Sequence, residues 1–178
     1  MNKHNLLFIG MITALLGYLS VAPKGQYYVK RFAKMVSDNG IKFLQNLELF
    51  SSKAYWDVKG WSIGYGHFMG ANKLEDNISL ARAIELMKND LNWVEKAIKN
   101  RVHVTLNQNQ YDALVSFVYN VGDANFASSS LLTKINASDF VGASHVFSLY
   151  NKIRKNGQLV VSQSLVTRRE KERALFVS

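Results

Sequence analysis

The sequence predicts an α+β fold that is mostly helical, with a small antiparallel sheet and an N-terminal hydrophobic helix. Three observations predict this fold. Apolar residues recur every three or four positions over residues 80–98, which indicates a long amphipathic helix. Residues 53–68 combine aromatic and β-branched side chains with glycines, a pattern typical of a short hairpin. Residues 6–22 form an apolar run without any charge.

The composition is that of a folded chain with one main domain and a short appendage. The chain has 178 residues, of which 48% are hydrophobic and 20% charged, and this balance excludes the disordered class. The absence of cysteine excludes disulfides, thiolate metal sites and a cysteine nucleophile. The net charge of +9 predicts attraction to a polyanion, and nucleic acid, anionic lipid and bacterial envelope polymers all qualify.

The apolar run from Leu6 to Ala22 predicts a membrane anchor. It is slightly shorter than the span of about 20 residues that usually crosses a bilayer, and it resembles a signal-peptide core as much as a permanent span. Ser20 to Ala22 offer the small residues that a signal peptidase needs, but Pro23 is an unfavourable first mature residue. An uncleaved anchor is therefore expected over residues 1–24. A core helix of the domain is the alternative.

Residues 25–38 are expected to form a basic amphipathic connector. Their apolar and basic residues recur at helical spacing, which suits either an anionic membrane surface or a solvated helix packed on the domain. More lysines and arginines follow the apolar run than precede it. Positive-inside counting therefore places the part of the chain after the run in the cytoplasm, although whole domains cross membranes regardless of such charges.

Residues 39–178 are expected to form the main domain. A helix starting near residue 41 should end near Glu48, and further helices are predicted over residues 107–119, 128–135, 138–150 and 164–176. Glycine and asparagine mark loops between them, at Gly122, Asn136 and Asn156-Gly157.

Four residues close together in the sequence could carry chemistry: Glu48, Asp57, Ser62 and His67. Glu48 follows Leu47 and precedes Leu49 and Phe50, and an apolar setting would favour the protonated form that a general acid needs. Asp57 lies among polar and glycine-rich neighbours, where it could stay ionised and act as a base. The Ser62 hydroxyl could hold an attacking water beside Asp57. Taken singly, each is more often an ordinary surface residue.

The segment E48-x8-D57-x4-S62-I-G-Y-G-H67 resembles the active-site motif of phage-type lysozymes, the endolysins of glycoside hydrolase family 24. Three later stretches resemble the same family in the same order: LNQNQYDALVSFVYNVG at 106–122, NFASSSLLTKIN at 125–136 and LVTRREKERALF at 165–176. The resemblance covers roughly residues 41–176. It implies a two-lobed domain whose lobes are connected by a long helix.

The resemblance implies hydrolysis of the β-1,4 bond between N-acetylmuramic acid and N-acetylglucosamine, with inversion. Glu48 would protonate the glycosidic oxygen, Asp57 would activate water, and Ser62 replaces the usual threonine. Tyr55, Gly64 and His67 would shape the substrate site. The chain departs from the family pattern at Leu49 and Ser164, where glycine is usual, and Ser62 lies one residue nearer to Asp57.

No cofactor is expected, and the four histidines lack metal-ligand spacing. The basic cluster at 168–173 alternates with glutamates, as on a salt-bridged helix, so nucleic acid is not an expected partner. The expected partners are peptidoglycan glycan strands and, through Leu6 to Ala22, the inner membrane, with the chain a monomer.

The resemblance to signal-anchor-release endolysins implies a phage protein that faces the periplasm of the host and is later released into it. Three alternatives stay open: a membrane-anchored virion lysozyme, a catalytically inactive peptidoglycan-binding protein, and a lytic transglycosylase.

Overall fold

The computed structural model describes residues 19–21, 27–29, 34–57 and 60–178, which belong to two units, Met1–Lys34 and Met35–Ser178. In the first unit, strands β1 (Leu19–Val21) and β2 (Tyr27–Val29) pair antiparallel. The helix expected over residues 6–22 lies mostly outside the described residues, and so does part of the connector expected over residues 25–38. Where described, residues 19–21 and 27–29 are strands, as the valines and tyrosines among them favour. No helix within the described ranges is long and apolar enough to span a bilayer.

The second unit begins with α1 (Asp38–Glu48), which the sequence placed correctly. The hydroxyl of Ser37 caps the helix by accepting a hydrogen bond of 3.0 Å from the amide of Gly40. Gly40 is buried, and a Cβ at this position would lie 2.6 Å from the carboxyl carbon of Asp112, so the lack of a side chain lets α1 approach α3. The helix ends at Glu48 because Leu49 has a positive φ of 57° and turns the chain away.

The predicted hairpin is part of a three-stranded antiparallel sheet in the order β3 (Ser51–Asp57), β4 (Gly60–Gly64) and β5 (His67–Gly70). Its register places Tyr55 opposite Ser62, and Asp57 opposite Gly60 at the end of the β3–β4 pair where the chain passes from one strand to the next. The rings of Trp56 and Trp61 meet edge to face at 5.6 Å. The sheet thus presents Asp57 at the tip of a strand.

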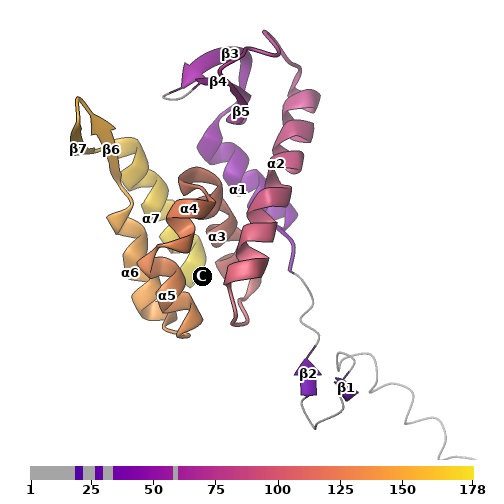
Figure 1. The fold of residues 1–178 in the computed structure, drawn as a ribbon, viewed down its shortest axis with the longest axis vertical. Helices are drawn as coiled ribbons and strands as arrows, with labels where there is room; N and C mark the ends of the chain where they lie inside the picture. Colours follow the sequence, from indigo (N-terminus) through magenta and orange to yellow (C-terminus); the bar gives the residue numbers. More distant parts are fainter. Residues whose placement is uncertain (1–18, 22–26, 30–33, 58–59) are drawn as a thin grey trace, which may run out of the picture. The chain divides into compact units, whose positions relative to one another are not determined.

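The long helix α2 (Leu80–Arg101) runs from the small sheet to the remaining helices (Figure 1). The predicted stripe is its buried face: Met87, Leu91, Val94 and Ile98 lie in the core, whereas Leu80, at the first turn, is exposed. The sheet therefore packs on one part of α2 and the helical core on another. This arrangement confirms the lysozyme-like architecture of a small sheet and a helical lobe joined by a long helix.

The remaining helices surround α3 (Gln108–Val121), whose N-terminus is closed by a capping box between Asn107 and Gln110. The other elements are α4 (Asp123–Ala127), α5 (Ser130–Asn136), α6 (Phe140–Val146), the 3₁₀-helix η1 (Phe147–Leu149), β6 (Lys152–Lys155), β7 (Gln158–Val161) and α7 (Gln163–Val177). The predicted helices are confirmed, except that the one over 138–150 stops earlier and continues as η1. The β6–β7 hairpin around Asn156-Gly157 was predicted only as a loop.

Candidate active site

Glu48 is the last residue of α1 and lies against α7. Its Oε1 atom is 2.7 Å from Nη1 of Arg168, and the two side chains are 16% and 8% exposed, respectively. Its Oε2 atom points elsewhere, since a Cβ on Gly66 would lie 3.4 Å from it. The two oxygens of this carboxyl group therefore have different neighbours, the Arg168 guanidinium group beside Oε1 and Gly66 beside Oε2.

The expectation of an apolar setting around Glu48 is wrong. Leu49 is 71% exposed and Phe50 is 41% exposed, because the chain leaves the helix at this point and both side chains turn outward. The nearest group is instead the positive charge of Arg168. Neighbours in the sequence were a poor guide to neighbours in space at a helix end.

Asp57 lies exposed at the end of β3. The pKa of the Tyr55 phenol is raised first by burial, next by the charge of Asp57 and then by that of Glu48. The charges of both carboxylates thus disfavour ionisation of the Tyr55 hydroxyl. The two carboxylates belong to different elements, Asp57 to the sheet and Glu48 to α1.

Ser62 lies on β4 directly opposite Tyr55, so the register brings it to the same part of the sheet. Its side chain is only 2% exposed. A serine buried to this degree packs within the sheet, and its contact with an attacking water remains a prediction.

Gly64 and His67 join the sheet to α2. Gly64 has a φ of 68°, and a Cβ on it would lie 3.0 Å from the Cβ of Ala83, so a larger residue would push the sheet away from the helix. Nδ1 of His67 lies 2.9 Å from Oδ2 of Asp90. Both residues therefore hold the sheet on α2, and their role in shaping a substrate site remains a prediction.

Tyr119, on α3, is an aromatic residue near Glu48 that the sequence did not single out. The Tyr119 hydroxyl donates a hydrogen bond of 3.0 Å to the carbonyl of Tyr65, which connects α3 to the β4–β5 turn. The pKa of Tyr119 is raised first by burial, then by the nearby charges of Asp90 and Glu48. The ring of Trp93 stacks on Tyr119 at 6.4 Å. Only the fold brings these residues together, so no local pattern could have identified them.

Part of the basic run on α7 lies in the interior rather than on a solvated face. Arg168, Arg169 and Glu172 are all buried, and Glu172 forms ion pairs with both arginines. These pairs confirm the expected salt-bridged helix, but their location in the interior was not expected. The stretch LVTRREKERALF was the available signal, because it belongs to the family resemblance. Across the described part of the chain, no cluster of histidine, aspartate and glutamate is arranged to hold a metal ion.

We expect His67→Asn to lower the free energy of unfolding by about 1.5–3 kcal/mol, the usual range for a hydrogen bond to a charged group. The substitution removes the contact with Asp90 that joins the sheet to α2. Urea unfolding measures the change, and His103→Asn is the control because that histidine is exposed. Equal stabilities of the two variants would contradict the structural role of His67.

Comparison with known proteins places these elements in one family. The family model described as phage lysozyme matches residues 45–172. An endolysin of Salmonella phage P22 is 40% identical over 151 residues, which cover 80% of this chain and 98% of the relative. A SAR-endolysin of Enterobacteria phage P21 is 36% identical over 98 residues, covering 54% of this chain and 59% of the relative.

Solved structures agree with this family. The muramidase domain of SpmX from Asticaccaulis excentricus superposes with a TM-score of 0.76 at 32% identity, covering 81% of this chain and 98% of that one. A P22 lysozyme superposes with a TM-score of 0.69 at 39% identity, covering 82% and 99%. The matches cover the small sheet, α2 and the helical lobe together.

Proposed function

Because the chain belongs to the phage lysozyme family, among its endolysins, we propose that it hydrolyses the β-1,4 bond between N-acetylmuramic acid and N-acetylglucosamine in peptidoglycan. The observation that carries this proposal is the placement of Glu48 and Asp57 at one small sheet. Oε2 of Glu48 lies beside Gly66, between β4 and β5, and Asp57 ends β3 of the same sheet. The charges of both also raise the pKa of the Tyr55 phenol, after the effect of its burial. Two carboxyl groups that share a site in this way can divide the roles of acid and base.

In the proposed reaction, Glu48 donates a proton to the glycosidic oxygen as the bond to the sugar C1 breaks. Asp57 takes a proton from a water molecule, whose oxygen then bonds to C1, and the Ser62 hydroxyl orients this water. Tyr55 lines the site, while Gly64 and His67 maintain its shape through α2. The net charge of +9 favours association with an anionic wall polymer.

We expect Asp57→Asn to lower kcat on purified peptidoglycan by about 100-fold, since the amide cannot accept the proton of the attacking water. Release of reducing ends measures kcat, and Asp38→Asn in the first turn of α1 is an exposed control. An Asp57→Asn variant as active as the control would remove Asp57 from the mechanism.

The proposed stereochemistry is inversion. A water molecule between Asp57 and the sugar requires carboxyl groups about 6.5–9.5 Å apart, whereas a separation of about 5–5.5 Å accompanies a covalent, retaining route. Proton NMR of the first products identifies the anomer that forms, and an α-anomer is the expected one.

We further propose that residues 1–24 are an uncleaved signal anchor and residues 25–38 a basic connector to a catalytic domain at 39–178. The anchor would hold the enzyme at the inner membrane facing the periplasm until its release. The uncharged run from Leu6 to Ala22 supports this, as does the similarity to SAR-endolysins.

Fractionation of expressing cells tests the anchor. We expect the full-length chain in the membrane fraction first and in the periplasmic fraction after release. A shortened protein that begins near residue 23 would contradict an uncleaved anchor. A variant with Leu15→Lys and Leu16→Lys, which places two charges in the apolar run, is expected to lose membrane association.

A further inference from the structure

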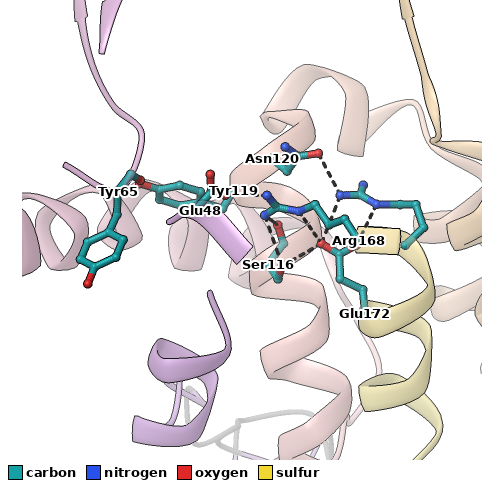
Figure 2. Close-up of polar contacts among 8 residues, drawn as sticks. Glu48, Tyr65, Ser116, Tyr119, Asn120, Arg168 and Glu172 are labelled. Carbon is teal, nitrogen blue, oxygen red and sulfur yellow. Dashed lines mark hydrogen bonds and ion pairs between the residues drawn. The ribbon is translucent and has the colours of Figure 1, made fainter. Parts of the chain in front are cut away.

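A buried ionic cluster lies behind Glu48, between α3 and α7, with the carboxylate of Glu172 at its centre. Glu172 is 0% exposed. Its Oε1 atom accepts hydrogen bonds from the Ser116 hydroxyl at 2.7 Å, from Nε of Arg168 at 3.0 Å and from Nη2 of Arg169 at 3.1 Å. Nε of Arg169 lies 3.0 Å from the other oxygen, Oε2. One carboxylate therefore organises three side chains (Figure 2).

Every nitrogen of the Arg168 guanidinium group has its own partner. Nε donates to Glu172, Nη2 donates to the carbonyl of Ser116 at 3.1 Å, and Nη1 lies 2.7 Å from Oε1 of Glu48. Because a guanidinium group is planar and rigid, two contacts on one edge determine where its third nitrogen points. The direction of Nη1 toward Glu48 thus follows from the contacts with Glu172 and Ser116.

We propose that Glu172 is a positioning residue for the catalytic acid. By fixing Arg168, it holds Oε1 of Glu48 and leaves Oε2, on the side of Gly66, as the oxygen that carries the transferred proton. This inference rests on the proposed function.

The chemistry of the ion pair explains why the proton belongs on Oε2. A guanidinium group is positively charged and has donors only, so it disfavours a proton on Oε1, the oxygen of Glu48 that faces Nη1 of Arg168. In the reaction, the bond between Oε2 and its proton breaks as the proton bonds to the glycosidic oxygen, and the bond from that oxygen to C1 breaks. Water supplies hydroxide to C1 and leaves its proton on Asp57. Gly66 keeps the space beside Oε2 free of a side chain.

Burying the charges of this cluster costs desolvation free energy, and a positioning role gives a reason for burying them. Burial raises the pKa of Glu172, an effect that the two arginines oppose. Burial also lowers the pKa of Arg169 to about 10, against the attraction of Glu172. Buried ion pairs are weak contributors to net stability because desolvation offsets their attraction. A fixed orientation of Arg168 is a benefit that an apolar replacement could not supply.

The test compares three variants that all alter the cluster. Glu172→Gln and Arg168→Lys alter the contacts that connect Glu172 to Glu48 through Arg168. Arg169→Lys alters a contact of the Glu172 carboxylate, but Arg169 forms no ion pair with Glu48. Thermal unfolding reports the stability of each, and kcat and KM are measured on purified peptidoglycan at a temperature where all are folded.

We expect Glu172→Gln and Arg168→Lys to lower kcat by about 10- to 100-fold with KM unchanged, as a small displacement of a reacting group does. Arg169→Lys is expected to lose stability but to keep kcat. The double variant of Glu172→Gln and Arg168→Lys should be no slower than the slower single variant, since both act through one contact.

Equal losses of kcat in Glu172→Gln and Arg169→Lys would overturn the proposal, and so would fully additive losses in the double variant. If Glu172→Gln does not fold, Ser116→Ala replaces it, since it removes a hydrogen-bond donor to Glu172 without changing charge. An unchanged kcat of Ser116→Ala would then overturn the proposal. Failure of the proposed function is distinguishable, because the wild-type chain itself would release no reducing ends.

Discussion

Glu48→Gln is expected to lower kcat on purified peptidoglycan by about 100- to 10,000-fold, the range typical for loss of a general acid or base. The amide matches the carboxyl group in size and can keep its oxygen beside Nη1 of Arg168, but it has no acidic proton to transfer. The fold should therefore be retained while the chemistry is lost. Release of reducing ends measures kcat, and thermal unfolding confirms that the variant is folded.

A matched control for Glu48→Gln is Glu170→Gln on α7. Glu170 is exposed and lies next to the arginines of the buried cluster in the sequence, so the substitution removes a comparable charge. We expect it to keep the wild-type rate. A Glu48→Gln variant that clears peptidoglycan as fast as Glu170→Gln would remove Glu48 from the reaction.

Glu172→Ala is expected to lower the free energy of unfolding by about 3–5 kcal/mol, because it leaves buried positive charges without their carboxylate. Arg169 would keep its hydrogen bond of 2.8 Å to Asn120, and Arg168 would keep its contacts with Glu48 and the Ser116 carbonyl. Neither contact replaces the charge at the centre of the cluster. Truncation of Glu172 is therefore expected to lower the free energy of unfolding more than truncation of an exposed residue of α7.

Urea unfolding measures the effect of Glu172→Ala, and Glu170→Ala is the control on the same helix. The exposed position should change stability by no more than about 0.5 kcal/mol. If Glu172→Ala costs no more than the control, the buried ion pairs do not contribute to folding.

The sequence predicted the helices well because their signals are local. The stripe from Met87 to Ile98 lies on one face of α2, and the core of the described domain buries that face. The end of α1 at Glu48 was predicted in the same way, although the helix begins three residues earlier than expected. These features depend on periodicity, which a short stretch of chain contains in full.

The β6–β7 hairpin was harder to predict because its two strands are almost fully exposed. Residues 152–155 and 158–161 show no alternation of buried and exposed positions. Without a buried face there is no period of two in the hydrophobic pattern, and only the turn residues Asn156 and Gly157 gave a signal.

The sequence proposed residues for the candidate site but did not predict their environment. Glu48, Asp57 and Ser62 were proposed from a short segment and from the family resemblance. The ion pair of Glu48 with Arg168, and the anchoring of Arg168 by Glu172, join α1 to a helix at the other end of the chain. Contacts of this kind depend on how helices pack, so local sequence patterns do not contain them.

The mass spectrum of the muropeptides released by the wild-type chain tests the central claim most directly. That claim is that Glu48 protonates the glycosidic bond while Asp57 delivers water to it. The account predicts products that carry one added water and end in a reducing N-acetylmuramic acid. Products that end in anhydro-N-acetylmuramic acid would contradict it, because they form without any water for Asp57 to activate.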